Sequence, residues 1–423
     1  MGYRLRENEL RQLFEMWNRD YVVYGPKSMA GEGMYSDTDV IRYERLERFE
    51  ELEWETKSAY SFKEAILPIT QILFYFTEDE VKEAEPERKK PALLFMRSCD
   101  IHALKRLDEI YLRNHYKDHF YARLRKNLRL VLLGCSESCE NGFCVSMGTN
   151  RTEDYDAAMN IKRVDGAVWA ELMSRADGIA RTEFMGCADG APLVDLLSHP
   201  AETTRTEFAH CGNGRELRKS DSWSSDLDAW ISGLDVEPSD VEPDYVKENR
   251  VRVRIPKECG PAQVRAGLWK EYDSRCIACG RCNFVCPTCT CFTMQDVFYQ
   301  DNGNVGERRR VHASCMVDGY TDVAGGGCCR NSKGERMRFK VLHKISDFKK
   351  QFGYQMCVGC GRCDDICPEY ISFSACVNRL ADMEDGDTQA AAAQAAAVQA
   401  AATQAAAAQA AAAQISASQK EVR

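Results

Sequence analysis

The sequence lacks features that would place the protein in several common classes. No apolar run approaches the ~20 residues needed to cross a bilayer, and the N-terminus, MGYRLRENEL, has no apolar signal core. It contains no G-x-G-x-x-G run after a strand and no phosphate-binding loop. The formal net charge of −9 is the opposite of the basic footprint of a nucleic-acid-binding protein. We therefore expect a cytoplasmic protein with no membrane or nucleic-acid partner and no dinucleotide site of its own.

Catalytic patterns are also missing. The seven histidines form no metal-ligand spacing, and no acid–base pair or activated nucleophile stands out. Cysteine, in contrast, is abundant, with 21 residues in a chain of 423. A disulfide framework is expected in short secreted chains, whereas this chain is long and has no export signal. Reduced thiolates that serve as metal ligands are the better interpretation.

Two cysteine runs have the same spacing, C-x2-C-x2-C-x3-C-P, which is typical of bacterial ferredoxins with two [4Fe–4S] clusters. The first run is Cys276, Cys279, Cys282 and Cys286 before Pro287; the second is Cys357, Cys360, Cys363 and Cys367 before Pro368. Gly280-Arg281 matches Gly361-Arg362, which indicates an internal duplication.

The fourth cysteine of each such run normally binds the other cluster. We therefore predict one ligand set of Cys276, Cys279, Cys282 and Cys367, and a second of Cys357, Cys360, Cys363 and Cys286. Structural zinc also uses paired C-x2-C units. Zinc, however, gives no reason for a third C-x2 step or for the terminal C-P.

A third group of cysteines precedes the two runs. Cys135, Cys139 and Cys144 follow the apolar run 128–133, and Cys99 follows the apolar run 91–96. If these runs are neighbouring parallel strands, their carboxyl ends lie at one edge of a sheet, where ligand sites of α/β units form. The four thiolates would then hold a third [4Fe–4S] cluster. The alternative is that they are buried free thiols that pack as small hydrophobic groups.

Nine cysteines remain, and packing or incidental thiols are the simplest interpretation for them. They are Cys187, Cys211, Cys259, Cys289, Cys291, Cys315, Cys328, Cys329 and Cys376. The adjacent pair Cys328-Cys329 follows Gly325-Gly326-Gly327 and is a candidate for redox activity. Cys289 and Cys291 follow the first motif directly and are candidates to pack against its cluster.

The order of predicted elements indicates an α+β protein, with an N-terminal mixed α/β domain, a helical ferredoxin-like domain for two [4Fe–4S] clusters and a low-complexity tail. We place these parts at 1–250, 251–383 and 384–423. The N-terminal part has a helical pattern at 10–17, strands at 21–24 and 128–133, a helix at 103–112 and a hairpin at 158–173. The cysteine-rich part has an amphipathic helix at 261–273 and a hairpin turn at Asn302-Gly303. In the tail, glutamine recurs every five residues among alanines, which gives no apolar stripe on a helix.

Basic residues gather between residues 308 and 350 of this acidic chain. They are Arg308, Arg309, Arg310, Arg330, Arg336, Arg338, Lys340, Lys344, Lys349 and Lys350. Such residues could offset the negative charge of thiolate-bound clusters or dock an acidic partner. A solvated face is an equally good interpretation.

Several phrases around the motifs resemble a known family. SRCIACGRCNFVCPTCTCFTMQDVFY, ASCMVDGYTDVAGGG, KGERMRFKVLHK and MCVGCGRCDDICPE look like the dicluster electron-transfer subunit of the anaerobic sulfite reductases. FMRSCDIHALKRLDEIYL and FCVSMGTN resemble the same proteins, together with the related beta subunit of sulfhydrogenases. The resemblance covers roughly residues 1–380 and leaves out the Ala/Gln tail.

The resemblance implies a division of labour among three subunits. An NADH-oxidising flavoprotein supplies electrons, this chain relays them through [4Fe–4S] clusters, and a sirohaem subunit reduces sulfite to sulfide. The chain itself would then be a non-catalytic electron-transfer subunit of an oxidoreductase complex. The resemblance also favours the third cluster, with one departure. Relatives read N-C-F-C where this chain has Asn141-Gly142-Phe143-Cys144, so Cys139 must supply the missing ligand or the site is lost.

Two other functions stay open. The first is the equivalent electron-transfer beta subunit of a hydrogenase or sulfhydrogenase. The second belongs to another class, a zinc-binding module that scaffolds other proteins.

Overall fold

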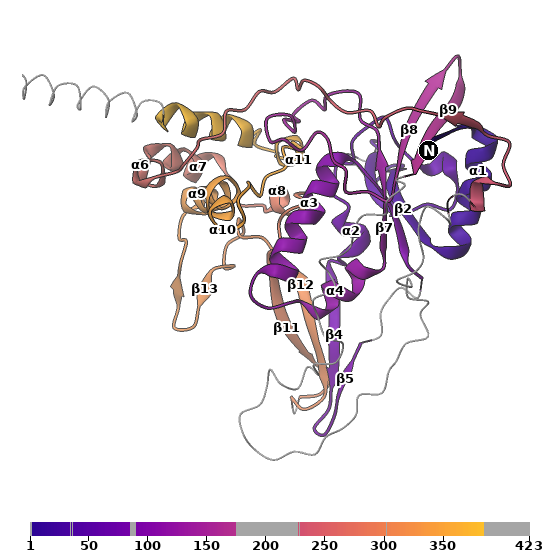
Figure 1. Ribbon diagram of the computed structural model, residues 1–423. Helices are drawn as coiled ribbons and strands as arrows, with labels where there is room; N and C mark the ends of the chain where they lie inside the picture. The colour runs from indigo at the N-terminus through magenta and orange to yellow at the C-terminus, as the bar shows by residue number, and fades with distance from the viewer. Residues whose placement is uncertain are drawn as a thin grey trace, which may run out of the picture.

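An eight-stranded sheet forms the centre of the N-terminal half in the computed structural model (Figure 1), which describes residues 2–33, 35, 37–84, 90–174, 227, 229–301 and 303–384. Its strand order is β10-β1-β9-β8-β7-β6-β2-β3. The strands are β1 (Gly2–Arg6), β2 (Val22–Met29), β3 (Val40–Arg45), β6 (Ala92–Met96), β7 (Leu128–Leu133), β8 (Ala157–Val164), β9 (Ala167–Ser174) and β10 (Glu237–Ser239). The four central strands β2, β6, β7 and β8 pair in parallel, whereas the outer pairs are antiparallel.

Both faces of this sheet are covered, which is why β6 and β7 are buried along their whole length. Leu93 and Phe95 of β6 pack in one core with α1 (Glu7–Asp20). Leu94 and Met96 point the other way, into a second core with α3 (Ser98–Asp108) and α4 (His119–Lys126). The alternation follows from the two-residue period of a strand.

The hairpin expected over 158–173 is confirmed as β8 and β9. Asp165 and Gly166 join the two strands with φ of 50° and 82°. Positive φ at both central residues is the requirement of a type I′ turn, which Asp-Gly meets readily.

A second sheet joins the two halves of the sequence. It has the order β11-β12-β4-β5, formed by β4 (Thr70–Phe76), β5 (Val81–Glu83), β11 (Phe292–Phe298) and β12 (Gly306–His312). Figure 1 shows these strands projecting together from the body. The hairpin expected between the two motifs is confirmed as β11–β12, and Gly303 lies in its loop with φ of 71°, while Asn302 lies outside the described residues. β12 pairs with β4, so strands from both sides of residue 250 share one ladder.

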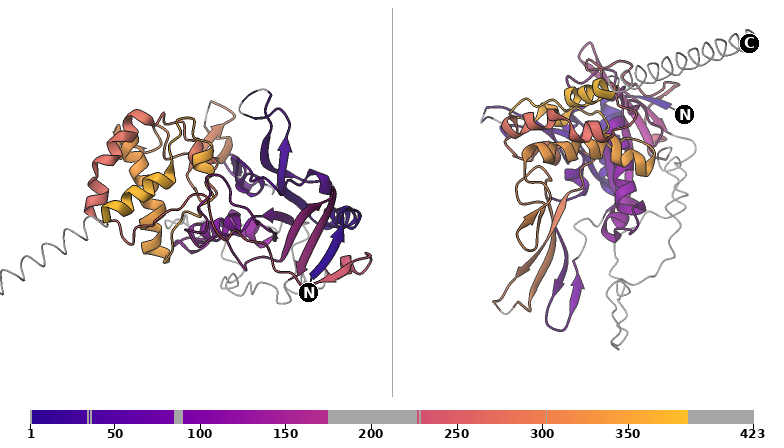
Figure 2. Two further views of the ribbon diagram at one scale, coloured as in Figure 1. Left: turned by 90° about the horizontal axis from the view of Figure 1, so that it is seen from above. Right: turned by 90° about the vertical axis from the view of Figure 1, so that its left-hand side faces the viewer.

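The cysteine-rich part has more helix than strand and lies beside the large sheet, as the view from above in Figure 2 shows. Helix α9 (Lys333–Leu342) leads through a π-helical turn (His343–Asp347) into α10 (Phe348–Phe352). Residues 373–384 are also helical. These helices enclose a separate core that includes Trp269, Val341 and Phe373.

The single helix expected over 261–273 is wrong in its continuity. The segment consists of α6 (Pro261–Arg265), a 3-10 turn (Gly267–Lys270) and α7 (Glu271–Arg275). Ala266 interrupts it with ψ of 139°, which is extended backbone. The apolar spacing nevertheless predicts correctly that Trp269 and Tyr272 are buried.

Short elements complete the description. They are a 3-10 turn (Phe49–Glu51), α2 (Lys63–Ile66), a π-helical turn (Glu109–Arg113), α8 (Arg281–Phe284), β13 (Asp322–Val323), β14 (Gly327–Cys328) and α11 (Arg362–Asp365). The fold is α+β, as the sequence predicts. Among the described residues, no helix has both the length and the apolar character needed to span a membrane. The Ala/Gln tail lies outside the described residues.

Candidate iron–sulfur sites

The two cysteine motifs fold into the same loop. In the first, Ala278 and Gly280 have φ of 57° and 75°; in the second, Gly359 and Gly361 have φ of 64° and 74°. A short helix, α8 or α11, follows each loop. In each loop the amide two residues after the first cysteine donates to that cysteine's Sγ at 3.4 Å. The duplication seen in the sequence is therefore also a duplication of backbone shape.

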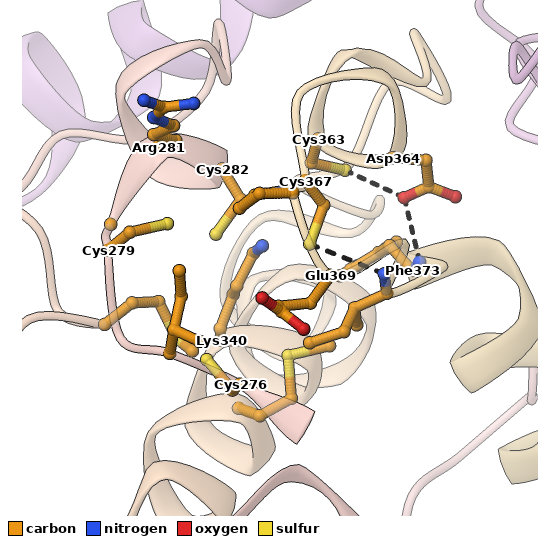
Figure 3. Close-up of a pocket in the computed structure, with 16 residues that line it drawn as sticks. Cys276, Cys279, Arg281, Cys282, Lys340, Cys363, Asp364, Cys367, Glu369 and Phe373 are labelled. Carbon is orange, nitrogen blue, oxygen red and sulfur yellow. Dashed lines mark hydrogen bonds between the residues drawn. The ribbon is translucent and has the colours of Figure 1, made fainter. Parts of the chain in front are cut away.

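The first site is a hollow lined by thiols from both motifs (Figure 3). The space between its lining residues, part of which is open to solvent, amounts to about 500 Å³. The predicted ligands that line it are Cys276, Cys279, Cys282 and Cys367. Cys363 also lines the hollow, but its Sγ donates to Asp364 Oδ1 at 3.4 Å. Cys367 of the second motif thus lies in the same hollow as the three thiols of the first, and its role as their fourth ligand stays a prediction.

The second site is more deeply buried. Burial, with the neighbouring thiols of Cys360 and Cys286, raises the pKa of Cys357 to about 12. Burial also raises the pKa of Cys360 and, more strongly, that of Cys363, and Cys286 contributes to both. Cys286 of the first motif thus lies among the three thiols of the second. Thiolates so far from water need nearby positive charge, which bound iron would supply.

The third group of cysteines gathers at one edge of the large sheet. β6 and β7 are neighbouring parallel strands, with Met96 opposite Leu132. Cys99 follows β6 in the first turn of α3, and Cys135 follows β7. Cys144 lies within electrostatic range of Cys99, Cys135 and Cys139. The structure therefore brings the four predicted residues together, and their role as ligands stays a prediction.

Two side chains hold the thiols of this third group. Arg97 Nη1 donates to Cys135 Sγ at 3.0 Å, and Asn249 Nδ2 donates to Cys144 Sγ at 3.5 Å. Arg97 is 6% exposed. Burial raises the pKa of Cys135, and the Arg97 guanidinium lowers it only in part. A positive charge beside a thiol favours the ionised form, which is the form that binds metal.

Gly142, which stands where relatives have a cysteine, lies beside Cys139. A Cβ added at Gly142 would lie 3.0 Å from Cys139 Cβ. A cysteine at position 142 and Cys139 therefore belong to the same corner of the site. This proximity favours Cys139 as the residue that takes over the role of the missing thiol.

The third group adjoins the second motif through a continuous set of hydrogen bonds. Phe143 N donates to Gly359 O at 2.7 Å, and Thr149 Oγ1 donates to Val358 O at 2.6 Å. Asn141 Nδ2 reaches Asp365 Oδ1 at 2.8 Å. The segment 139–149 is thus docked on the second cysteine loop, and the three thiol groups form a row.

Buried cations accompany the thiols, and sequence reasoning missed most of them. Lys57, whose side chain is 10% exposed, donates to Cys360 O at 2.7 Å and pairs with Asp365 at 2.6 Å. Lys340 and Lys344, which the sequence places only in a general basic stretch, are 4% and 3% exposed. Not every residue of this basic stretch is buried, since Arg308 pairs with Asp296 at the surface. The burial of Lys340 and Lys344 cannot be read from the sequence, because it depends on how the helix that carries them packs.

The donor set fits iron–sulfur clusters. All the predicted ligands are thiols, which is the chemistry of such clusters. Among the residues that the structure describes, no three cysteine, histidine or acidic side chains are close enough together to hold a single metal ion. The thiols of the first site instead line a hollow of larger size.

The other cysteines take varied places. Cys289 lies beside Cys286, and Cys291 lies beside Cys315. Cys259 and Cys376 are buried in the helical core, and Cys328 contacts Thr321 Oγ1 at 3.2 Å. Cys187 and Cys211 lie outside the described residues.

Comparison with known proteins agrees with this geometry. Residues 275–371 match the family described as 4Fe-4S dicluster domain. The chain is 28% identical over 354 residues to sulfhydrogenase 2 subunit beta of Pyrococcus furiosus, an alignment that covers 82% of this chain and 91% of that protein. No solved structure matches.

The fold, the thiol groups and these matches identify the chain as an iron–sulfur protein of the electron-transfer type, with a 4Fe-4S dicluster domain. More particularly, the chain is related to the beta subunit of a sulfhydrogenase.

Proposed function

We propose that this chain is the electron-transfer subunit of a cytoplasmic, anaerobic sulfite reductase complex. It takes electrons from an NADH-oxidising flavoprotein partner and delivers them to a sirohaem subunit that reduces sulfite to sulfide. The phrases around both motifs, which resemble the electron-transfer subunit of those enzymes, support this choice. The observation that supports the electron-transfer role is the row of thiol groups, with Cys367 lining the hollow of the first motif and Cys286 near the thiols of the second.

The proposed ligand sets follow from this row. Clusters of the [4Fe–4S] type accept and donate one electron at a time. The first cluster is held by Cys276, Cys279, Cys282 and Cys367, and the second by Cys357, Cys360, Cys363 and Cys286. A third is held by Cys99, Cys135, Cys139 and Cys144. The protein's part is to hold these thiols in fixed places, to keep water away and to supply buried cations.

No residue is proposed as catalytic, so the chemistry of the substrate belongs to the partner subunits. The proposed parts of the chain are 1–250, which carries the third thiol group, 251–383, which carries the two motifs, and the tail at 384–423. Strands from the first two parts share a sheet through β4 and β12. We therefore regard these parts as regions that differ in sequence composition but share secondary structure.

The second candidate is the beta subunit of a hydrogenase or sulfhydrogenase. The relative from Pyrococcus furiosus favours it as strongly as the sequence phrases favour the first. Co-purification of the native complex under anaerobic conditions separates the two. A partner that contains sirohaem supports the sulfite reductase, whereas a partner that contains nickel and iron contradicts it and supports the hydrogenase.

The third site has its own test. Cys135→Ser removes the thiol that Arg97 contacts at 3.0 Å, and we expect a loss of about four irons per chain, one cluster's worth. The measurement is an iron count on anaerobically purified chain. Cys259→Ser is the matched control, since Cys259 is 8% exposed and lies outside all three groups. Equal iron content in both variants would show that Cys135 holds no third cluster.

A further inference from the structure

Two buried lysines lie between the two cysteine motifs. Lys340 is on α9, and Lys344 follows one turn later, in the π-helical turn. They are 4% and 3% exposed. Residues four apart on a helix share a face, so both side chains extend toward the motifs from the same support. Local π-helix often marks a functional position in a helix.

The two lysines lie near different thiols. Lys340 lines the first hollow together with Cys282 and Cys363 (Figure 3). Lys344 donates to Thr288 Oγ1 at 2.8 Å and lies near Cys286 and Cys357. Lys340 therefore lies beside one thiol of each proposed set, Cys282 of the first and Cys363 of the second, whereas Lys344 lies near the second set alone.

Neither ammonium has a carboxylate partner within 4 Å among the described residues. Glu369 lines the same hollow as Lys340, but it is exposed and forms no ion pair with it. An unpaired buried charge is costly, so the negative charge that balances each lysine must come from the sites themselves.

We propose that Lys340 and Lys344 are the counter-cations of the first and second clusters and raise their reduction potentials. This inference rests on the ligand sets of the proposed function. Uptake of an electron makes a thiolate-bound cluster more negative by one charge, and net charge near a cluster is a determinant of its potential. A fixed ammonium in a poorly screened interior favours the reduced form. The electron comes from the flavoprotein partner, and neither lysine loses its proton.

The test uses the full chain, purified anaerobically, with Lys340→Gln and Lys344→Gln as the variants that remove charge. Lys340→Arg and Lys344→Arg keep the charge. Lys350→Gln is the matched control, because Lys350 lies on α10 nearby but is exposed, and water screens its charge. Iron is counted first, and midpoint potentials are then measured by redox titration followed by electron paramagnetic resonance.

The expected result is selective. Lys344→Gln makes the potential of one cluster more negative, and Lys340→Gln chiefly shifts the other. The arginine variants and Lys350→Gln stay close to the wild type. A merely structural role would not produce this dependence on charge.

Other outcomes are decisive as well. Full iron content with unchanged potentials in both glutamine variants would overturn the inference and leave the ligand sets intact. A wild-type chain without iron would overturn the proposed function first. If a glutamine variant loses iron, its arginine counterpart decides: retention of iron and potential supports the role of charge, and loss in both contradicts it.

Discussion

At the scale of single residues, an ion pair connects the third thiol group to the second motif. Arg362 donates to both carboxylate oxygens of Asp100, at 2.6 and 2.9 Å, and to Ser58 Oγ at 3.0 Å. The side chains of Arg362 and Asp100 are 0% and 1% exposed. Asp100 follows Cys99, and Arg362 precedes Cys363. One bidentate pair therefore fixes two cysteine-bearing segments relative to each other.

Replacing Arg362 with Met should destabilise the chain by about 3–5 kcal/mol, because it leaves the Asp100 carboxylate buried without its partner. The check is chemical denaturation under anaerobic conditions. Arg379→Met is the control, since Arg379 pairs with Glu271 at the surface, with side chains 46% and 34% exposed. We expect that variant to change stability little. Equal effects of the two substitutions would argue against the importance of the buried pair.

Sequence reasoning reached the cysteines but not this pair. The spacing of Cys276–Cys282 and Cys357–Cys363 is a local pattern, so it can be read directly. The pairing of Arg362 with Asp100 spans 262 positions, and no local pattern indicates it. The same holds for Lys340 and Lys344, whose burial depends on how α9 packs.

At the scale of elements, the segment 139–149 is held against the second cysteine loop at two glycines. A Cβ at Gly359 would lie 2.6 Å from Phe143 O, and one at Gly361 would lie 2.3 Å from Asn141 O. Only glycine allows the two backbones to approach so closely. This contact places the third thiol group next to the second.

Gly361→Ala should therefore push the segment 139–149 away and lower the iron content of the third site. Gly280→Ala is the matched control. Gly280 is the equivalent glycine of the first motif, with φ of 75° against 74°, but a Cβ there meets the side chains of Val317 and Ser314 rather than backbone. Iron counts on both variants give the comparison. If the control lost as much iron as Gly361→Ala, strain within the loop rather than docking would be the cause.

Elements with strong local signals were predicted well. Buried strands β6 and β7, helix α1 and the Asp165-Gly166 hairpin follow from apolar runs, helical spacing and turn chemistry. The segment 261–273 shows the limit, because its apolar spacing is helical while Ala266 and Gly267 break the backbone. Gly in a helix interior costs about 1 kcal/mol relative to Ala, and tertiary contacts decide whether the helix continues.

At the scale of the whole molecule, the second sheet makes the two main parts interdependent. β4 comes from the N-terminal part and pairs with β12 along Gly306–Val311. Lys63 Nζ, also N-terminal, donates to Cys289 O at 2.8 Å. The sequence does not indicate the pairing of β4 with β12, because contacts across more than two hundred residues have no local signature.

Residues 251–423 expressed without residues 1–250 should fail to form a soluble iron-containing protein. The fragment would expose the edge of β12 and lose Lys57 and Lys63 from the second site. Co-expression of the two fragments should restore soluble, iron-containing protein. A soluble fragment that holds the full iron of two clusters alone would show that residue 250 is a folding boundary.

The central claim is that the thiols of this chain hold iron–sulfur clusters for electron transfer. The most direct test is iron, sulfide and zinc analysis of the anaerobically purified full chain, with its absorbance recorded before and after reduction. We predict a coloured protein with about eight irons, or about twelve with the third cluster, that bleaches on reduction. A colourless protein with stoichiometric zinc would contradict the claim.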